Sequence, residues 1–295
     1  MLNPETLSRI RRIELRTRRL VNDSFAGAYH SVFKGRGIAF DSVRPYQPGD
    51  DVRDIDWNVT ARSDEAYIKH YAEERELTVM LVVDSSASTL FGTVDRPRRD
   101  LAAEIAAVLA LSAISNNDKV GLLIFSDRIE QYVAPRKGRN HVLRLIRELL
   151  VPRPGDRGTD LKLAVQSLNR MLHKRTIVFL VSDFLTPAES YRSDLIIAGR
   201  RHDVIALVLT DPLEQQWPGV GLVRVQDAET GITRIVNTSD RRWRKQFATQ
   251  ARQMSETRDS TLRSARVEQV AIAAGGDYVD ALAGFFRRRA LRMAR

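Results

Sequence analysis

Hydroxyl-bearing and acidic side chains occur in three short segments that lie far apart in the sequence. The first is an Asp-x-Ser-x-Ser sequence that runs from Asp84 to Ser88, the second contains Thr159, and the third contains Asp183. Hydroxyl and carboxylate oxygens are the donors that Mg²⁺ and other hard cations bind in proteins. If the fold brings these segments together, they could hold one divalent cation, Mg²⁺ or Mn²⁺.

The donor set is mostly neutral. Ser86, Ser88 and Thr159 offer uncharged hydroxyls, whereas Asp84 and Asp183 offer charge, either directly or through bound water. A cation held mainly by neutral donors retains affinity for a further anionic oxygen. We therefore expect an open coordination position that a carboxylate of a partner protein can fill.

Apolar runs must position these side chains. Val79–Val83 ends directly before Asp84, and Thr176–Val181 ends directly before Ser182 and Asp183. Short continuous apolar runs are typical of strands that are buried on both faces of a parallel sheet. Two further strands are expected at Val120–Phe125 and Val204–Leu209.

Helical segments separate the apolar runs. The expected helices cover Asp100–Ser115, His141–Leu150, Leu161–Leu172 and Ser190–Arg200. Alternating strands and helices imply a doubly wound α/β fold, with a mostly parallel sheet flanked by helices. Ligands of such sheets bind beyond the carboxyl ends of the strands, which is where the three segments are expected to meet.

The chain is expected to divide near residue 77. Residues 1–76 are predicted to form an irregular α+β extension, and residues 77–295 the α/β domain with C-terminal helices. The extension should contain a basic helix near its start, a loop region rich in Gly, Pro and Asp, and a strand at Ala66–Tyr71. The domain should end with a hairpin at one sheet edge, a long helix at Asp240–Ala274 and a basic helical tail.

Composition limits the class of protein. The 295 residues are 43% hydrophobic, which is enough for a sizeable core, and the absence of cysteine excludes disulfides and thiolate metal sites. No apolar run approaches the roughly 20 residues of a membrane span, and the N-terminus carries arginines instead of the apolar segment of a signal peptide. These features predict a cytoplasmic protein. The net charge of +10 leaves nucleic-acid binding through the basic ends open, although no nucleic-acid-binding signature is visible.

The spaced donors resemble a known metal site. Asp84, Ser86 and Ser88, together with Thr159 and Asp183, resemble the metal-ion-dependent adhesion site of von Willebrand factor A domains. The resemblance implies that the two serines and the threonine contact the ion and that the two aspartates act through water. It also implies that an acidic side chain of a partner completes the coordination.

A second resemblance lies upstream. Arg44–Trp57 and Tyr71–Glu76 resemble the signature of the bacterial DUF58 family. That family has a von Willebrand A-like domain and is typically encoded beside MoxR-type AAA+ ATPases, so such an ATPase is an expected partner. Many members carry two membrane helices ahead of the signature, whereas no such helices are visible here. The resemblance implies a protein-interaction module and not an enzyme.

The signature contains a cluster of charged residues. We expect its carboxylates to pair with Arg44, Arg53 and Arg62 and so to fix the loop against the domain, with Trp57 as a buried anchor. The alternatives are a second metal site or a docking loop. The candidate docking residues are Tyr46, Asp50, Asp51, Arg53, Asp56 and Trp57.

Two alternative interpretations of the donor residues remain. Asp84 and Asp183 could merely cap helices while Ser86 and Thr159 satisfy turns. Asp84 and Asp183 could instead hold a metal for phosphoester hydrolysis, although the usual additional carboxylate or histidine ligands are missing. Ser86 lacks the surroundings of a nucleophile, because no Gly-x-Ser-x-Gly sequence is present.

Overall fold

The computed structural model describes residues 26–33, 39–63, 65–72, 76–92, 97–151, 158–228 and 231–293. Its centre is a six-stranded sheet with the order β10-β7-β6-β3-β4-β5. All neighbouring strands are parallel except β5, which runs antiparallel to β4. The strands are β3 (Thr78–Asp84), β4 (Lys119–Phe125), β5 (Ile129–Arg136), β6 (Ile177–Ser182), β7 (Asp203–Thr210) and β10 (Glu268–Ala273). The predicted mostly parallel α/β sheet is confirmed, as are its four predicted strands.

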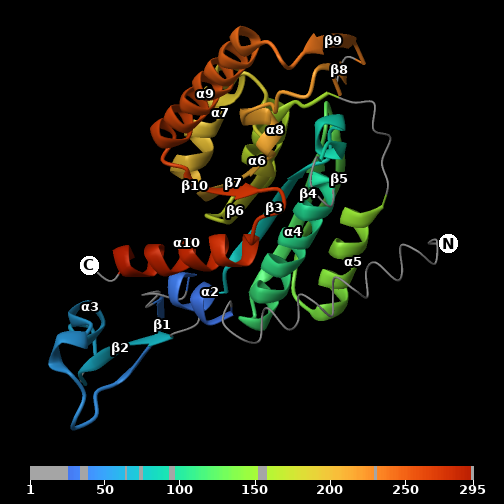
Figure 1. The fold of residues 1–295 in the computed structure, drawn as a ribbon. Coiled ribbons are helices and arrows are strands. Elements are labelled where there is room, and N and C mark those ends of the chain that lie inside the picture. Colours follow the sequence, from blue (N-terminus) through green and yellow to red (C-terminus); the bar gives the residue numbers. More distant parts are fainter. Residues whose placement is uncertain are drawn as a thin grey trace.

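Helices cover both faces of this sheet (Figure 1). On β3, Val79, Leu81 and Val83 face one buried core, whereas Met80 and Val82 face the other. This alternation explains why the run is continuously apolar. The first core is covered by α2 (Ala26–Phe33), α4 (Arg98–Ser115), α5 (Arg139–Leu150) and α10 (Tyr278–Met293), and the second by α6 (Leu161–Met171), α7 (Ala188–Arg201) and the end of α9 (Arg241–Ser264).

The long C-terminal helix was predicted wrongly. It ends at Ser264, and the chain turns through Arg266, whose φ is 59°, into strand β10. Only Val270 and Ile272 of this edge strand are buried, and its other residues are Ala, Glu and Gln. These residue types favour a helix, but pairing with β7 makes the segment a strand.

The predicted hairpin exists, but it does not extend the central sheet. Its strands β8 (Leu222–Gln226) and β9 (Thr233–Asn237) pair only with each other among the described residues. A second small sheet, β1 (Ala39–Pro45) with β2 (Tyr67–Ala72), carries the signature segment. The two small sheets lie at opposite ends of the molecule (Figure 1). Strand β1 falls in a stretch that we expected to contain only turns and loops.

Part of the predicted extension packs into the α/β core. Tyr29 of α2 is fully buried, and its ring lies 5.9 Å from that of Phe286 on α10. Phe33 of α2 likewise lies 6.2 Å from Phe179 on β6, measured between ring centroids. Helix α2 therefore packs with the α/β domain although it precedes residue 77 in the sequence, and the division of the chain near residue 77 stays a prediction. The predicted basic helix near the N-terminus falls outside the described residues.

Substituting Gly199 with alanine should destabilise the protein. A Cβ atom at this position of α7 would lie 2.0 Å from the backbone oxygen of Ala265, which follows α9. Because backbone must shift to relieve this overlap, we expect Gly199→Ala to lower the free energy of unfolding by about 1–3 kcal/mol or more, measured by urea denaturation.

Gly284→Ala in α10 is the matched control. The nearest atom to its added Cβ would be the flexible Arg288 guanidinium, at 3.3 Å. Alanine is the better helix former by about 1 kcal/mol, so this variant should be neutral or slightly more stable. Equal losses in both variants would contradict the proposed steric cause.

Candidate metal centre

The first and third donor segments meet at the carboxyl ends of two neighbouring strands. β3 ends at Asp84 and β6 at Ser182, and the two strands pair in parallel with Val83 opposite Val181. Asp183 therefore emerges beside Asp84, although about one hundred residues separate them. This is the edge at which ligands of parallel sheets bind.

Direct hydrogen bonds join these residues. Ser88 Oγ donates to Asp183 Oδ2 at 2.7 Å and lies 3.0 Å from Ser86 Oγ. Ser182 Oγ donates to Asp84 Oδ2, also at 2.7 Å. All five side chains are buried. The result is a compact cluster of hydroxyl and carboxylate oxygens contributed by two segments.

The local backbone fixes the direction of these side chains. Asp84 Oδ1 accepts a hydrogen bond from Ser86 N at 2.9 Å, which folds the chain back directly after β3. A short 3₁₀ helix, η3 (Ala87–Leu90), follows and contains Ser88. After Asp183, Phe184 adopts φ 55°, a left-handed conformation that is uncommon for residues other than glycine. Its amide donates to Ser182 Oγ at 3.1 Å.

The Thr159 segment lies at the same edge of the sheet. The amide of Asp160 donates to the carbonyl of Ser126 at 2.8 Å, and Ser126 directly follows β4. The last residue of β4, Phe125, pairs with Asp84. Asp160 itself caps α6 by accepting from the Leu163 amide. Thr159 thus lies in the loop that opens α6, at the carboxyl end of β4, and its contact with an ion stays a prediction.

The two aspartates form an electrostatically strained pair. Burial and then the negative charge of Asp183 raise the pKa of Asp84 well above its usual range, while hydrogen bonds from Ser182 and Ser86 partly oppose the rise. A divalent cation would offset the desolvation and the repulsion of both carboxylates. Hydroxyls and carboxylates are also suitable donors for Mg²⁺, so the residues present fit such an ion.

A buried arginine borders the cluster. Arg98, at the start of α4, is 1% exposed, and its guanidinium lies 3.5 Å from Asp183 Oδ2. It donates to the carbonyl of Ser88 at 2.8 Å and also pairs with Glu214. Arg98 is thus the one positive charge that contacts the candidate donors among the described residues.

Glu214 connects this arginine to the next element. It belongs to α8 (Pro212–Gln215), where it forms a capping box with Asp211, the residue that follows β7. Burial raises the pKa of Glu214, and the positive charge of Arg98 opposes the rise. A continuous polar chain therefore runs from Asp183 through Arg98 to the first turn of α8.

Sequence reasoning missed Arg98 and Glu214. One signal was available, because Arg98 and Arg99 occupy the first turn of α4. Positive charge is unfavourable at a helix N-terminus. Two arginines there indicate that something else holds them. Ser182 was noticed only as a neighbour of Asp183, whereas the structure shows it bonded to Asp84.

The signature loop differs from its predicted role. Arg44 does pair with Asp50, with its Nη2 at 2.7 Å from Oδ1, but Arg53 and Arg62 are exposed and form no ion pair with other described residues. Trp57 is 69% exposed, so its prediction as a buried anchor is wrong.

The remaining carboxylates of this loop mostly serve its own turns. Asp51 accepts from the amide of Arg53 at the start of the 3₁₀ helix η2 (Val52–Asp54), and Asp56 caps the one-turn helix α3 (Trp57–Thr60). Tyr46 is half-buried, and its amide donates to the carbonyl of Ala66. The aromatic and acidic groups that stay exposed are compatible with a docking loop, which stays a prediction.

Two features are absent from the described part of the chain. None of the described helices is long and apolar enough to cross a membrane. The same residues contain no group of three or more His, Cys, Asp or Glu side chains that could hold a metal. The candidate centre has two carboxylates and three hydroxyls, so it does not belong to that carboxylate- and histidine-rich class.

Comparison with known proteins gives a family and a fold. Residues 42–257 match the family described as "Protein of unknown function DUF58". "Uncharacterized protein Mb1516" of Mycobacterium bovis is 36% identical over 235 residues, which cover 79% of this chain and 74% of that protein. "Uncharacterized protein Rv1480" of Mycobacterium tuberculosis matches equally well.

Solved structures resemble this chain at low sequence identity. An aerotolerance-related membrane protein from Bacteroides fragilis is 14% identical, with a TM-score of 0.50, and the match covers 73% of this chain and 99% of that one. A von Willebrand factor type A structure from Catenulispora acidiphila is 10% identical, with a TM-score of 0.41 and coverage of 74% and 42%. The family match spans most of the sequence, and on that basis the chain belongs to the DUF58 family.

Proposed function

We propose that this chain is a protein-interaction module that binds one Mg²⁺ ion, or Mn²⁺, and uses it to hold an acidic residue of a partner protein. Ser86, Ser88 and Thr159 would hold the ion, with Asp84 and Asp183 beside them. The observation that carries the proposal is the bonded cluster of Ser86, Ser88 and Asp183 at the carboxyl ends of β3 and β6.

The chemistry of this cluster suits binding better than turnover. A bound ion would supply positive charge to the carboxylate of the partner, while the three neutral hydroxyls would leave that charge largely unneutralised. Asp84 and Asp183 are both buried, so a cation at this place would relieve their repulsion in addition to attracting the partner. We therefore propose a non-enzymatic role.

The proposed partner follows from the family and not from the site. The DUF58 family is typically encoded beside MoxR-type AAA+ ATPases, and we propose that this chain works with such an ATPase in the assembly or maturation of other proteins, in the cytoplasm. A cation that captures an acidic residue would let the module attach reversibly to the ATPase or to its client.

A retention experiment tests the proposal. Immobilised full-length protein should retain a purified MoxR-type ATPase from the same organism in Mg²⁺, release it in a chelator, and recover it when Mg²⁺ is restored. Ser86→Ala and Asp183→Ala should abolish retention, because both residues belong to the bonded donor cluster. Retention would be measured as the fraction of ATPase bound at equilibrium.

Ser85→Ala is the matched control for that experiment. Ser85 directly precedes Ser86, but its hydroxyl donates to the carbonyl of Phe125 and takes no part in the cluster. This variant should retain the ATPase. Equal retention by every variant in chelator would show that the cation is not the contact. Phosphoester turnover that is lost in Asp84→Ala would instead identify an enzyme.

A further inference from the structure

Helix α9 forms one wall of a groove that passes the candidate metal centre. Three neighbouring hollows, of about 730, 260 and 440 Å³, follow one side of this helix. The first and second share Gln215, Ala251 and Ser255, and the second and third share Phe184 and Met254, among others. We call this continuous surface the α9 groove.

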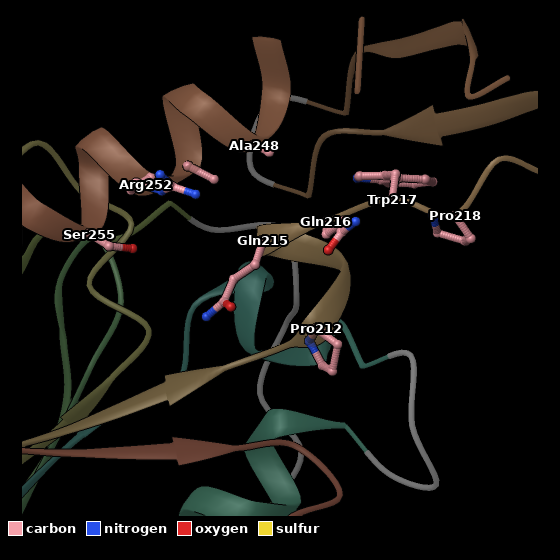
Figure 2. A pocket seen from close by; sticks show the side chains of 9 residues that line it. Pro212, Gln215, Gln216, Trp217, Pro218, Ala248, Arg252 and Ser255 are labelled. Atoms are coloured by element: carbon pink, nitrogen blue, oxygen red, sulfur yellow. The ribbon is translucent and has the colours of Figure 1, made fainter. Parts of the chain in front are cut away.

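The first hollow lies between α8 and α9. Figure 2 shows Pro212 and Gln215 of α8 facing Arg252 and Ser255 of α9 across it. Trp217 lines the same hollow, and its ring packs edge-on against Trp243 and Phe247 of α9, with centroids 6.1 and 6.3 Å apart. These aromatic contacts hold this end of the groove in a fixed shape.

The middle hollow borders the metal centre and is largely apolar. Asp183 itself lines it, and the same wall continues into Phe184 and Leu185. On the α9 side, Met254 is 53% exposed, and Leu185, which lines the same hollow, is 42% exposed. At about 260 Å³ this hollow is smaller than typical small-molecule pockets of about 300–1,000 Å³. Its size is suited to one apolar side chain.

The helix that lines the groove is strongly basic. Arg252 lines the first hollow and forms no ion pair with other described residues, and Arg258, which pairs with Asp259, lines the second and third. The charged residues of α9 are basic Arg241, Arg242, Arg244, Lys245, Arg252, Arg258 and Arg263 and acidic Glu256 and Asp259. The hollows are also lined by Glu189 and by Asp183 and Glu214, which both contact Arg98, so it is the α9 wall of the groove that attracts an acidic segment and repels a basic one.

We infer that the partner is an acidic, extended peptide segment in which the carboxylate that binds the cation stands within about three residues of an apolar side chain. This inference rests on the proposed function. The carboxylate reaches the ion beside Asp183, the apolar side chain enters the middle hollow between Leu185 and Met254, and further acidic residues lie along α9. Specificity comes from the apolar contact, because the cation alone would accept any accessible carboxylate.

Selection from a random peptide library tests this inference. Phage displaying linear random dodecapeptides would be bound to immobilised full-length protein in Mg²⁺ and eluted with a chelator. The eluted sequences should be enriched in Asp or Glu with a large apolar residue within three positions. One selected peptide, made synthetically with a fluorophore, would then serve as the probe for affinity measurements.

Two α9 variants separate the apolar contact from general charge. Met254→Glu places a carboxylate in the middle hollow, whereas Gln246→Glu adds the same charge at an exposed position of α9 that lines none of the three hollows. Met254→Glu should weaken peptide binding at least tenfold, and Gln246→Glu less than threefold. Both variants should bind Mn²⁺ with the affinity of the wild type, measured by electron paramagnetic resonance.

Different negative results of these experiments would contradict either this inference or the proposed function. Metal-dependent peptides that contain an acidic residue but no neighbouring apolar residue, or equal effects of the two variants, would overturn this inference and leave the proposed function intact. Selected peptides that resist the chelator or lack an acidic residue would overturn the proposed function, and the inference with it. Failure to enrich any peptide in Mg²⁺ would count against both.

Discussion

Adding Mg²⁺ to the metal-free protein should raise its free energy of unfolding by about 2.7 kcal/mol when free Mg²⁺ is one hundred times its dissociation constant. A ligand that binds only the folded state stabilises it by mass action, and the donor cluster exists only in the folded state. Asp84→Asn should abolish this response, because Asp84 lies in the cluster through its bond from Ser182 Oγ.

The same variant should not lower the stability of the metal-free protein. Burial and the charge of Asp183 both disfavour a charged Asp84, so a neutral side chain of the same shape removes a repulsion. The asparagine side chain would keep an oxygen for the bond that Asp84 Oδ1 now accepts from the amide of Ser86. We therefore expect metal-free Asp84→Asn to be as stable as wild type or more stable.

Urea denaturation of chelator-treated protein, with and without added Mg²⁺, measures both effects. The alternative role of Asp84 as a turn cap makes the opposite prediction. In that case Mg²⁺ leaves the wild type unchanged, and Asp84→Asn loses stability to the same extent in both conditions. The pair of measurements therefore distinguishes a metal ligand from a structural cap, which a single loss of stability could not do.

The strands that carry the candidate site could be predicted because their burial is nearly uniform. β6 is buried along its whole length, and β3 along all but its first residue. Such strands leave a continuous apolar run in the sequence, and a polar residue marks where each one ends. The positions of Asp84 and Asp183 at one sheet edge follow from that pattern together with the parallel arrangement.

Elements at the margins of the fold lack such a pattern. Half of the residues of β10 face solvent, so its composition resembles the helix before it. Trp57 is exposed although large aromatic side chains are usually buried, and no local pattern in the sequence separates an anchor from a surface residue. Similarly, the contact of Arg98 with Glu214 joins α4 to α8, and neither helix signals the other in sequence.

Replacing Arg98 with alanine should cost about 3–5 kcal/mol of unfolding free energy, which is typical when one partner of a buried ion pair is removed. Its guanidinium is almost fully buried, and it contacts Asp183, Glu214 and the carbonyl of Ser88. Without it, two carboxylates and one carbonyl would lose their positive partner. Urea denaturation in chelator measures the loss.

Arg128→Ala is the matched control for this substitution. Arg128 pairs with Glu130 but is 59% exposed, and exposed pairs contribute about 0–1 kcal/mol. A further comparison tests the coupling itself. If Arg98 and Glu214 act as a pair, the double variant Arg98→Ala/Glu214→Gln should be more stable than the sum of the two single losses predicts, by about 0.5–3 kcal/mol. Strictly additive losses of stability would show that Arg98 stabilises the protein through contacts other than the one with Glu214.

Arg98 also connects stability to the proposed metal. Its guanidinium lies 3.5 Å from Asp183 Oδ2, so it already provides part of the positive charge that a cation would bring. Removing it should therefore make Mg²⁺ bind more tightly and stabilise Arg98→Ala by more than it stabilises the wild type at the same concentration. A smaller Mg²⁺ response in Arg98→Ala would mean that the arginine helps to organise the donors instead of competing with the ion.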